Sequence, residues 1–458
     1  MYKINFQKPI HIHFIGIGGI SMSGLAEILL EEGFTVSGSD AKESPLTKKL
    51  ESEGAVIHYG QCAENITDDI NCVVYTAAIN KSNPELMEAV GKKIPMLTRA
   101  ELLGQLMKNY DTPIAVSGTH GKTTTTSMIS EVLLAADMDP TISVGGILKT
   151  IGGNIRVGKS GNFITEACEY TNSFLHFYPK ISVILNIEED HLDFFKDLED
   201  IRHSFHQFSA LLPSDGTLII NGDIKDYQEI YEGLDCNVIT YGSSAEFDYS
   251  ATEIQYDEKG FVSFELLKHN TSCGRVQLSV TGDHNVSNAL AAIATAELLG
   301  IPMDTIRKGL LSFSGTDRRF EYKGTFNGVT VVDDYAHHPT EIAATLKAAQ
   351  HYPHNEIWCV FQPHTYTRTK AFFHEFAEVL SHTDHLVLAD IYAARETDTL
   401  GVSSAGLAEE ARKLGTDAHY LPSFEEIEAF LKENCKSGDL LITMGAGDVV
   451  KIGEDLLK

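Results

Sequence analysis

The sequence predicts an α/β protein of three domains, each built on a mostly parallel sheet. Apolar runs alternate with segments of helical periodicity along the whole chain, which is typical of βαβ units. Glycine-rich turns join a strand to a helix near residues 16–19 and 118–121. With 458 residues, the chain is too long for one hydrophobic core, because single cores stop growing at about 250–300 residues.

The first domain is expected at residues 1–108. Its predicted strands are 10–17, 34–40 and 72–77, and its helices include 83–90 and 99–108. The polar segment 109–113 ends in Pro113, which favours a connection over a helix interior.

The second domain is expected at 109–316 and the third at 317–458. In the second, strands are predicted before the turn at 118–121 and at 162–166, 181–187 and 217–221. Short alternating strands follow at about 237–282, and a helix near Asn285. These short strands indicate hairpins, a small antiparallel section. The third domain alternates again, with strands at 329–335, 357–362, 385–390 and 440–447 and helices after Thr340 and at 369–380.

Composition narrows the classes of partner. The 36 Lys and Arg residues face 64 Asp and Glu residues, a net charge of −28, which argues against nucleic acid and anionic membranes as partners. Seven scattered cysteines form no Cys-x-x-Cys pair, so we expect reduced thiols and a cytoplasmic protein. The first residues lack a basic segment leading into an apolar core, so neither a signal peptide nor a membrane helix is expected.

The segment Ser117-Gly-Thr-His-Gly-Lys-Thr-Thr124 follows an apolar strand and precedes a helix. Such a turn presents backbone N–H groups to phosphate, while a lysine neutralises charge and a hydroxyl ligates Mg²⁺. It predicts an ATP site formed by Gly118, Thr119, His120, Gly121, Lys122, Thr123 and Thr124. Only two residues separate its glycines, fewer than in the standard phosphate loop, and the alternative is a solvated turn.

A second glycine turn contains Gly16, Gly18, Gly19 and Ser21, and Asp40 ends the next strand. This arrangement is close to a dinucleotide fingerprint, with the acid near the ribose position. It predicts a nucleotide site, for which NAD is one candidate. The alternative is tight helix-to-sheet packing without a ligand.

Acidic and histidine side chains follow two further strands of the second domain. Glu166 ends one strand, and Asp190-His191 follows another, so both are expected at the carboxyl edge where open α/β sheets bind ligands. Glu166 and Thr123 are suitable Mg²⁺ ligands. His191 is either a third ligand or a hydrogen-bonded histidine, and Asp190 could instead cap a helix.

Three clusters near and within the third domain are further candidates. Asn285 and Asn288 could bind an adenine edge, or merely cap their helix. Arg318 and Arg319 offer positive charge for phosphate, and Asp334 offers a carboxylate for ribose. The alternative for both arginines is surface pairing. His364 and Arg368 follow a buried strand and could face a cleft.

Eight ordered motifs together resemble the Mur ligase family, over about residues 10–450. They are GIGGISMSGLAE, GTHGKTTT, TEACEYTNSF, NIEEDHLD, GDHNVSNALAA, DRRFE, DDYAHHPTE and FQPHTYTRT. The resemblance implies a Rossmann-like domain that binds a UDP-sugar, a central ATPase, and a Rossmann-like third domain that closes on the nucleotide. It also implies that ATP drives the joining of L-alanine to UDP-N-acetylmuramate through an acyl phosphate, so that the first glycine turn holds UDP and not NAD.

The same resemblance assigns roles to single residues. It implies that Lys122 neutralises the transferring phosphate, that Thr123 and Glu166 hold one Mg²⁺, and that Glu166 and His191 hold a second. Other roles follow from it in the same way: adenine contacts for Asn285 and Asn288, a phosphate contact for Arg319, ribose-side contacts for Asp334 and His337, the amino-acid end for His364 and Arg368, and the muramyl carboxylate region for Glu169 and Asn172.

The sequence leaves other functions open. A close alternative joins the same UDP-sugar acid to a preformed tripeptide in peptidoglycan recycling. A nicotinamide-dependent oxidoreductase would use the first glycine turn, and a non-catalytic ATP sensor would use only the second. We expect a monomer or homodimer.

Overall fold

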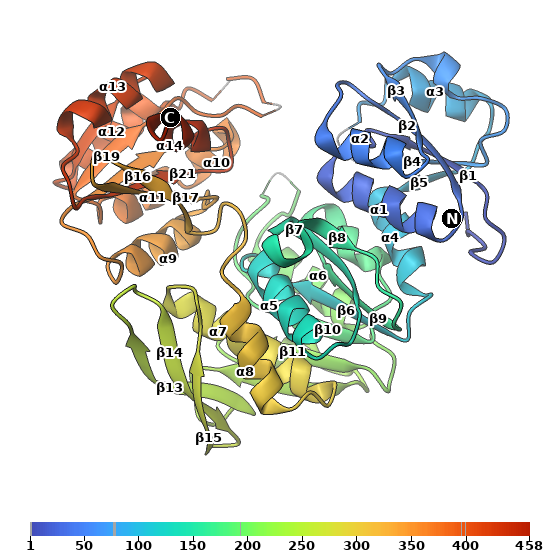
Figure 1. Ribbon diagram of the computed structural model, residues 1–458, viewed down its shortest axis with the longest axis horizontal. Coiled ribbons are helices and arrows are strands. Elements are labelled where there is room, and N and C mark those ends of the chain that lie inside the picture. The colour runs from blue at the N-terminus through green and yellow to red at the C-terminus, as the bar shows by residue number, and fades with distance from the viewer. Residues whose placement is uncertain (1, 77–78, 193, 395, 399) are drawn as a thin grey trace. The chain divides into compact units, whose positions relative to one another are not determined.

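The computed structural model describes residues 2–76, 79–192, 194–394, 396–398 and 400–458 (Figure 1). The chain divides into two compact units, residues 1–248 with 291–309, and residues 249–290 with 310–458. Three sheets flanked by helices, mostly parallel with some antiparallel strands, confirm the predicted fold class.

The first sheet is parallel, in the order β3-β2-β1-β4-β5. Its apolar first strand is almost wholly buried, and Thr98 and Glu101 form a capping box that starts α4. The predicted strand 72–77 ends at Tyr75, and Ala77 lies outside the described residues. The elements are β1 (His11–Ile15), α1 (Ile20–Glu31), β2 (Thr35–Asp40), α2 (Pro45–Ser52), β3 (Val56–Tyr59), β4 (Cys72–Tyr75), α3 (Pro84–Gly91), β5 (Met96–Thr98) and α4 (Arg99–Met107).

The second sheet contributes strands in the order β12-β11-β10-β6-β9-β7-β8 to the first unit. All are parallel except β8, which returns antiparallel to β7. Its strands are β6 (Thr112–Ser117), β7 (Thr141–Leu148), β8 (Gly153–Arg156), β9 (Asn162–Glu166), β10 (Ile181–Ile184), β11 (Thr217–Asn221) and β12 (Asn237–Gly242), with helices α5 (Lys122–Ala135), α6 (Leu198–Ser209) and the 3₁₀ segment η3 (Tyr170–His176).

The second unit contains the predicted hairpins. Strands β13 (Tyr249–Tyr256), β14 (Val262–Lys268) and β15 (Thr271–Gln277) pair antiparallel. The expectation was too wide at its start, because β12 pairs parallel with β11 and continues the main sheet. Helices α7 (Asp283–Leu298) and α8 (Met303–Ser312) follow along the chain.

The third sheet has the order β16-β17-β21-β18-β19-β20, antiparallel only between its first two strands. The helix expected at 369–380 is two helices that meet at Phe372. The elements are β16 (Glu321–Phe326), β17 (Val329–Asp334), α9 (Pro339–Ala349), β18 (Ile357–Phe361), α10 (Tyr366–Ala371), α11 (Phe373–Leu380), β19 (His385–Leu388), α12 (Ser404–Lys413), β20 (Asp417–Tyr420), α13 (Phe424–Asn434), β21 (Leu440–Met444) and α14 (Val450–Leu456).

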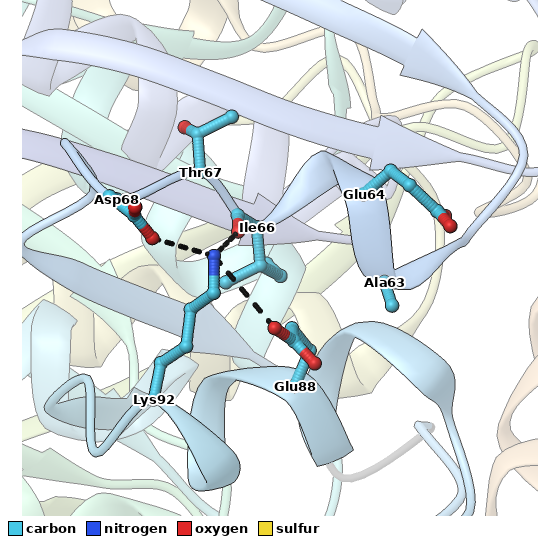
Figure 2. A pocket seen from close by; sticks show the side chains of 7 residues that line it. All are labelled: Ala63, Glu64, Ile66, Thr67, Asp68, Glu88 and Lys92. Carbon is cyan, nitrogen blue, oxygen red and sulfur yellow. Dashed lines mark hydrogen bonds and ion pairs between the residues drawn. The ribbon is translucent and has the colours of Figure 1, made fainter.

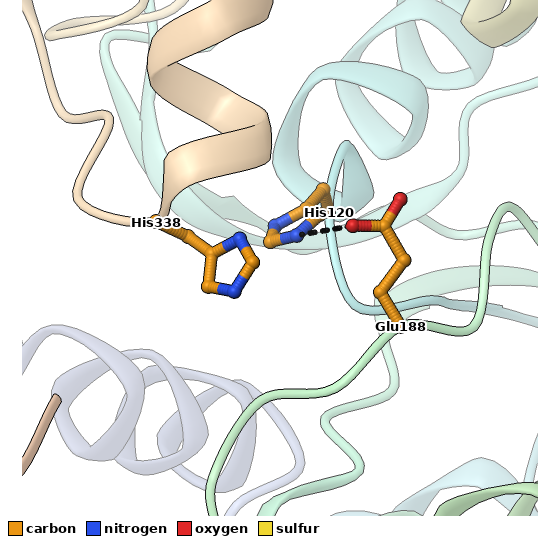
Figure 3. Close-up of side chains that lie close together, drawn as sticks. All are labelled: His120, Glu188 and His338. Atoms are coloured by element: carbon orange, nitrogen blue, oxygen red, sulfur yellow. Dashed lines mark ion pairs between the residues drawn. The ribbon is translucent and has the colours of Figure 1, made fainter. Parts of the chain in front are cut away.

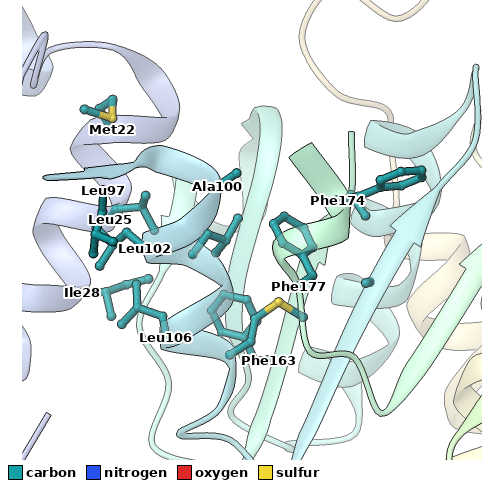
Figure 4. Packing of buried hydrophobic residues seen from close by; sticks show 14 of the residues in the cluster. Met22, Leu25, Ile28, Leu97, Ala100, Leu102, Leu106, Phe163, Phe174 and Phe177 are labelled. Atoms are coloured by element: carbon teal, nitrogen blue, oxygen red, sulfur yellow. The ribbon is translucent and has the colours of Figure 1, made fainter. Parts of the chain in front are cut away.

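Helix α4 links the two sheets of the first unit (Figure 4). Leu102 and Leu106 on this helix belong to the same buried cluster as Leu25 on α1 and Phe163 on β9. Phe174 of η3 joins that cluster. Burial of apolar surface therefore fixes η3 to α4.

All seven cysteines are free thiols. Within the described ranges, no helix combines the length and the apolar character needed to cross a bilayer.

Candidate active site

The phosphate loop lies between β6 and α5, as the sequence predicts. Gly121 has φ 83° and caps α5, and Gly118 has φ 146°; these conformations favour glycine. A Cβ at Gly118 would lie 2.9 Å from Cβ of Leu185. The loop therefore passes close to the end of β10. The first N–H groups of α5 have no acceptor within the helix, so they are available to a ligand at the end of the loop.

The Asn186 side chain anchors this loop to the segment that follows β10. Its Oδ1 accepts a hydrogen bond from the His120 N–H at 2.7 Å, and its Nδ2 donates to the His120 carbonyl at 3.1 Å. Sequence reasoning missed Asn186, although it stands directly before the acidic motif that follows β10. His120 also forms an ion pair with Glu188, Nε2 to carboxylate oxygen 3.5 Å (Figure 3).

Lys122 is held inside the loop by three acceptors. Its Nζ donates to the carbonyls of Gly118 and Thr119 and, at 2.9 Å, to Oε2 of Glu169. Burial alone would lower the pKa of Lys122, but the negative charge of Glu169 outweighs it and the pKa is raised. Lys122 is therefore an ammonium held by three acceptors within the predicted phosphate loop.

Glu166 ends β9 beside the loop. Its Oε1 accepts a short hydrogen bond from the Gly145 N–H of β7. A Cβ at Gly145 would lie 2.9 Å from the other oxygen, Oε2. The carboxylate is thus oriented by backbone, and it leaves acceptor capacity for a hard cation.

His191 lies beside Glu169. Its Nε2 is 3.7 Å from Glu169 Oε1 and 3.7 Å from Asp190 Oδ2. Its φ of 54° is left-handed, and its ring lies against Tyr170 with 4.5 Å between centroids. Left-handed backbone at a non-glycine residue persists only where the surroundings enforce it. The structure thus brings Lys122, Glu169 and His191 together.

Asn172 sits in a strained turn of η3. Thr171 and Asn172 both have left-handed φ, 55° and 56°, which is uncommon for a β-branched residue. Ser204 of α6 donates a short hydrogen bond to Asn172 Oδ1. This turn follows directly after Glu169, so its backbone conformation helps to position the Glu169 side chain.

Two further side chains give this centre its electrostatic character. Burial lowers the pKa of Arg99 at the start of α4, while Cys168 and Glu166 oppose the shift. Burial also raises the pKa of Cys168, with Glu169 adding to the effect, so Cys168 is a neutral thiol. Sequence reasoning gave Arg99 no role, because nothing local distinguishes an arginine in the first turn of a helix.

The first glycine turn is closed by Asp40. Its Oδ2 accepts from the Gly18 N–H at 2.9 Å, and its Oδ1 accepts from Ala41 at 2.8 Å. Gly16 has φ 83° and donates to the Ser39 carbonyl at 2.9 Å. Gly19 caps α1, which contains Ser21. The predicted residues therefore form one turn, in which the acid orders the backbone.

In the second unit, Asp334 is buried at the end of β17. It accepts hydrogen bonds from the N–H groups of Phe320 and Ala336, at 2.8 and 2.7 Å. Burial raises its pKa to about 6, although Arg319 and these two donors oppose the shift. A carboxyl group with a pKa of about 6 can accept or lose a proton near physiological pH.

Glu341 connects the other predicted residues of this region. It lies 3.9 Å from Arg319 and 3.2 Å from the ring of His337, carboxylate oxygen to nitrogen in each case. It also accepts from the His337 N–H at 3.0 Å. Glu341 was missed, because its place in the first turn of α9 reads equally well as a helix-dipole partner.

Arg318 anchors the same region. Its guanidinium bonds Asp333 at 2.9 Å and the carbonyls of Gly445 and Gly447 at 2.7 and 3.0 Å. The surface pairing considered for both arginines therefore does not hold for Arg318, whose partner Asp333 is fully buried.

The remaining predicted residues of this unit form two pairs. Asn288 donates to Asn285 Oδ1 at 3.0 Å, and Asn285 donates to the Thr281 carbonyl at 2.7 Å. His364 Nδ1 lies 3.4 Å from Arg368, and its ring stacks on Tyr392 with 5.7 Å between centroids. The asparagine pair lies in the first turns of α7, as predicted. The pair formed by His364 and Arg368 follows the buried strand β18, also as predicted.

A hollow of about 660 Å³ lies elsewhere, between the 63–68 segment and α3 (Figure 2). Its lysine, Lys92, already donates to the Ile66 carbonyl at 2.6 Å and to Asp68 at 2.8 Å, and lies 3.8 Å from Glu88. We regard this hollow as an ordinary surface depression and not as a ligand site.

Comparison with known proteins covers nearly the whole chain. Residues 11–111 match the Mur ligase family, catalytic domain; residues 116–296 the Mur ligase middle domain; and residues 318–447 the Mur ligase, glutamate ligase domain. The UDP-N-acetylmuramate--L-alanine ligase of Agathobacter rectalis is 64% identical over 458 residues, all of both chains. That of Acetivibrio thermocellus is 54% identical over 98% of this chain and 96% of its own.

Solved structures agree. The UDP-N-acetylmuramate-alanine ligase of Thermotoga maritima has a TM-score of 0.82 at 28% identity, over 98% of each chain. A murein peptide ligase from Psychrobacter arcticus has a TM-score of 0.71 at 26% identity, also over 98% of each.

Proposed function

The chain belongs to the Mur ligase family, and on that basis we propose that it is an ATP-dependent ligase that joins L-alanine to the lactyl carboxylate of UDP-N-acetylmuramate in peptidoglycan synthesis. One observation carries this function: relatives named for that reaction are 62–64% identical along the full length of the chain. The nicotinamide-dependent oxidoreductase and the ATP sensor have no comparable support and are set aside.

A free carboxylate is a poor electrophile, so it must be activated before an amine can attack it. We propose that a carboxylate oxygen attacks the γ-phosphorus of ATP, which releases ADP and leaves an acyl phosphate. The amine of L-alanine then attacks the acyl carbon, the C–O bond to phosphate breaks, and the amine loses a proton. Positioning and neutralisation of charge dominate such phosphoryl transfer.

Lys122 is suited to this step, because its ammonium is fixed at the mouth of the phosphate loop. Gly118, Thr119, His120, Gly121, Thr123 and Thr124 would surround the phosphates. From the second unit we assign adenine contacts to Asn285 and Asn288, a phosphate contact to Arg319, and ribose-side contacts to Asp334 and His337. His364 and Arg368 would bind the amino-acid carboxylate.

Mg²⁺ fits the donors present beside the loop. The Glu166 carboxylate is oriented by backbone, and Oε1 of Glu169 has no hydrogen-bond partner among the residues that the structure describes. Thr123, Glu166 and His191 would hold it, in two sites. When bound, it would neutralise charge on the phosphate oxygens. The chain's own contribution is to orient Glu166 through Gly145 and His191 through its backbone.

We further propose that Gly16, Gly18, Gly19, Ser21 and Asp40 hold the UDP moiety, and that Glu169 and Asn172 lie toward the sugar acid. The domains would be residues 1–108, 109–316 and 317–458, and the protein would act in the cytoplasm. We propose a monomer or homodimer.

The test is product formation. Protein, ATP, Mg²⁺ and UDP-N-acetylmuramate are mixed with L-alanine, glycine, L-serine or L-alanyl-γ-D-glutamyl-meso-diaminopimelate, and ADP and the amide are measured. We expect the highest kcat/KM with L-alanine. A higher kcat/KM with the tripeptide would assign the recycling reaction instead. A rate of ADP release that does not depend on any of these amines would contradict a ligase.

A further inference from the structure

The two carboxylate oxygens of Glu169 have unequal surroundings. The side chain is buried, with an exposed fraction of 3%. Oε2 accepts the hydrogen bond from Lys122, whereas Oε1 is buried and, within the described part of the chain, has no hydrogen-bond partner. A buried acceptor without a partner costs free energy and calls for a ligand.

His191 faces this orphaned oxygen. The 3.7 Å between its Nε2 and Oε1 of Glu169 is too long for a hydrogen bond. A divalent cation about 2.1 Å from each of two ligand atoms holds them about 3.0–3.6 Å apart, for angles of about 90–120°. A small rotation of either side chain would therefore let one cation bind both atoms.

The histidine is already fixed for that role. Its N–H donates to Asp190 Oδ1 at 2.7 Å, and its ring lies against Tyr170. On the other side of Glu169, Lys122 competes with any cation, because its ammonium lies 2.9 Å from Oε2 and like charges at such distances repel. A phosphate in the loop would draw Lys122 away and leave the carboxylate uncompensated.

We propose that Glu169 and His191 jointly ligate a divalent cation. In the absence of phosphate, the Lys122 ammonium pairs with the Glu169 carboxylate in place of that cation, and phosphate in the loop draws the ammonium away. This inference deepens the proposed function, because it adds a carboxylate ligand to the second cation beside Glu166. It is compatible with a place for Glu169 near the sugar acid, since a cation is what lets two carboxylates approach each other.

The first test needs neither nucleotide nor turnover. Mn²⁺ binding to the full chain is measured by electron paramagnetic resonance for the wild type, for Lys122→Met, and for Lys122→Met combined with Glu169→Gln. Without the competing ammonium, Lys122→Met should bind Mn²⁺ at least about tenfold tighter than the wild type. The double variant should lose that gain. Unchanged affinity in Lys122→Met, or a gain that survives Glu169→Gln, would overturn the proposal.

The second test adds the β,γ-imido analogue of ATP. We expect Glu169→Gln to weaken the second Mn²⁺ by at least about tenfold, and Glu169→Asp, which keeps a carboxylate, to recover most of it. Equal Mn²⁺ binding by the wild type and Glu169→Gln would contradict the proposal. Neither result depends on which amine the enzyme accepts, so failure of the proposed function would appear separately, in the product assay.

Discussion

Gly104 of α4 packs directly against the carbonyl oxygen of His176, the last residue of η3, so closely that a Cβ at position 104 would overlap that oxygen. Helix α4 belongs to the first sheet, whereas η3 follows Glu169 in the phosphate-loop domain. The contact therefore couples the position of η3, and of Glu169 just before it, to the amino-terminal α/β layer.

Gly104→Ala should displace η3. We expect a loss of about 1–3 kcal/mol in the free energy of unfolding, since the backbone must move, together with lower kcat. Denaturant unfolding and steady-state turnover measure the two effects. Gly91→Ala is the matched control, because it is also a helical glycine and no described atom lies within 4 Å of a Cβ there. It should be neutral or slightly stabilising. Similar losses from both substitutions would argue against a specific α4–η3 contact.

The pair formed by Lys122 and Glu169 should show strong energetic coupling. Lys122→Ala leaves a buried carboxylate without its partner, at a cost of about 3–5 kcal/mol, and also abolishes turnover. Lys122→Ala combined with Glu169→Gln removes the stranded charge, so part of that stability should return. Thermal and denaturant unfolding of the two single variants and the double variant complete the cycle. Simple additivity would show that the two side chains do not interact.

Asp334 should make stability depend on pH. Its pKa is raised to about 6 by burial, so its contribution is fully present below about pH 4 and is lost as pH rises through about 6. Relative to Asp334→Asn, the wild type should gain roughly 1 kcal/mol in the free energy of unfolding between pH 7.5 and 5.5. Denaturant titrations at both pH values measure this difference. A difference between the two proteins that stays constant with pH would rule out titration of Asp334 in this range.

The sequence predicts most of this fold, because strands such as β9 and β11 are apolar runs bounded by polar residues. The antiparallel return of β8 was not expected, since Gly145, Gly146, Gly152 and Gly153 interrupt the alternation that marks a strand pair.

The candidate site is predictable in part. The phosphate loop is a local motif, so Lys122 could be placed from the sequence. The closeness of Glu169 to both Lys122 and His191 could not, because it depends on left-handed backbone at Thr171 and His191, which tertiary packing enforces against local preference. Asn186 was missed because its partner, His120, is distant in sequence. Glu341 was missed because an acidic residue in the first turn of a helix is equally well explained by the helix dipole.

The proposed reaction requires the substrate carboxylate to attack the γ-phosphorus at the loop that holds Lys122. UDP-N-acetylmuramate labelled with ¹⁸O in its lactyl carboxylate tests this most directly, with mass analysis of the phosphate released during ligation of L-alanine. We expect one carboxylate-derived ¹⁸O in each phosphate and one in the amide. Phosphate without label, or label recovered in AMP, would contradict it.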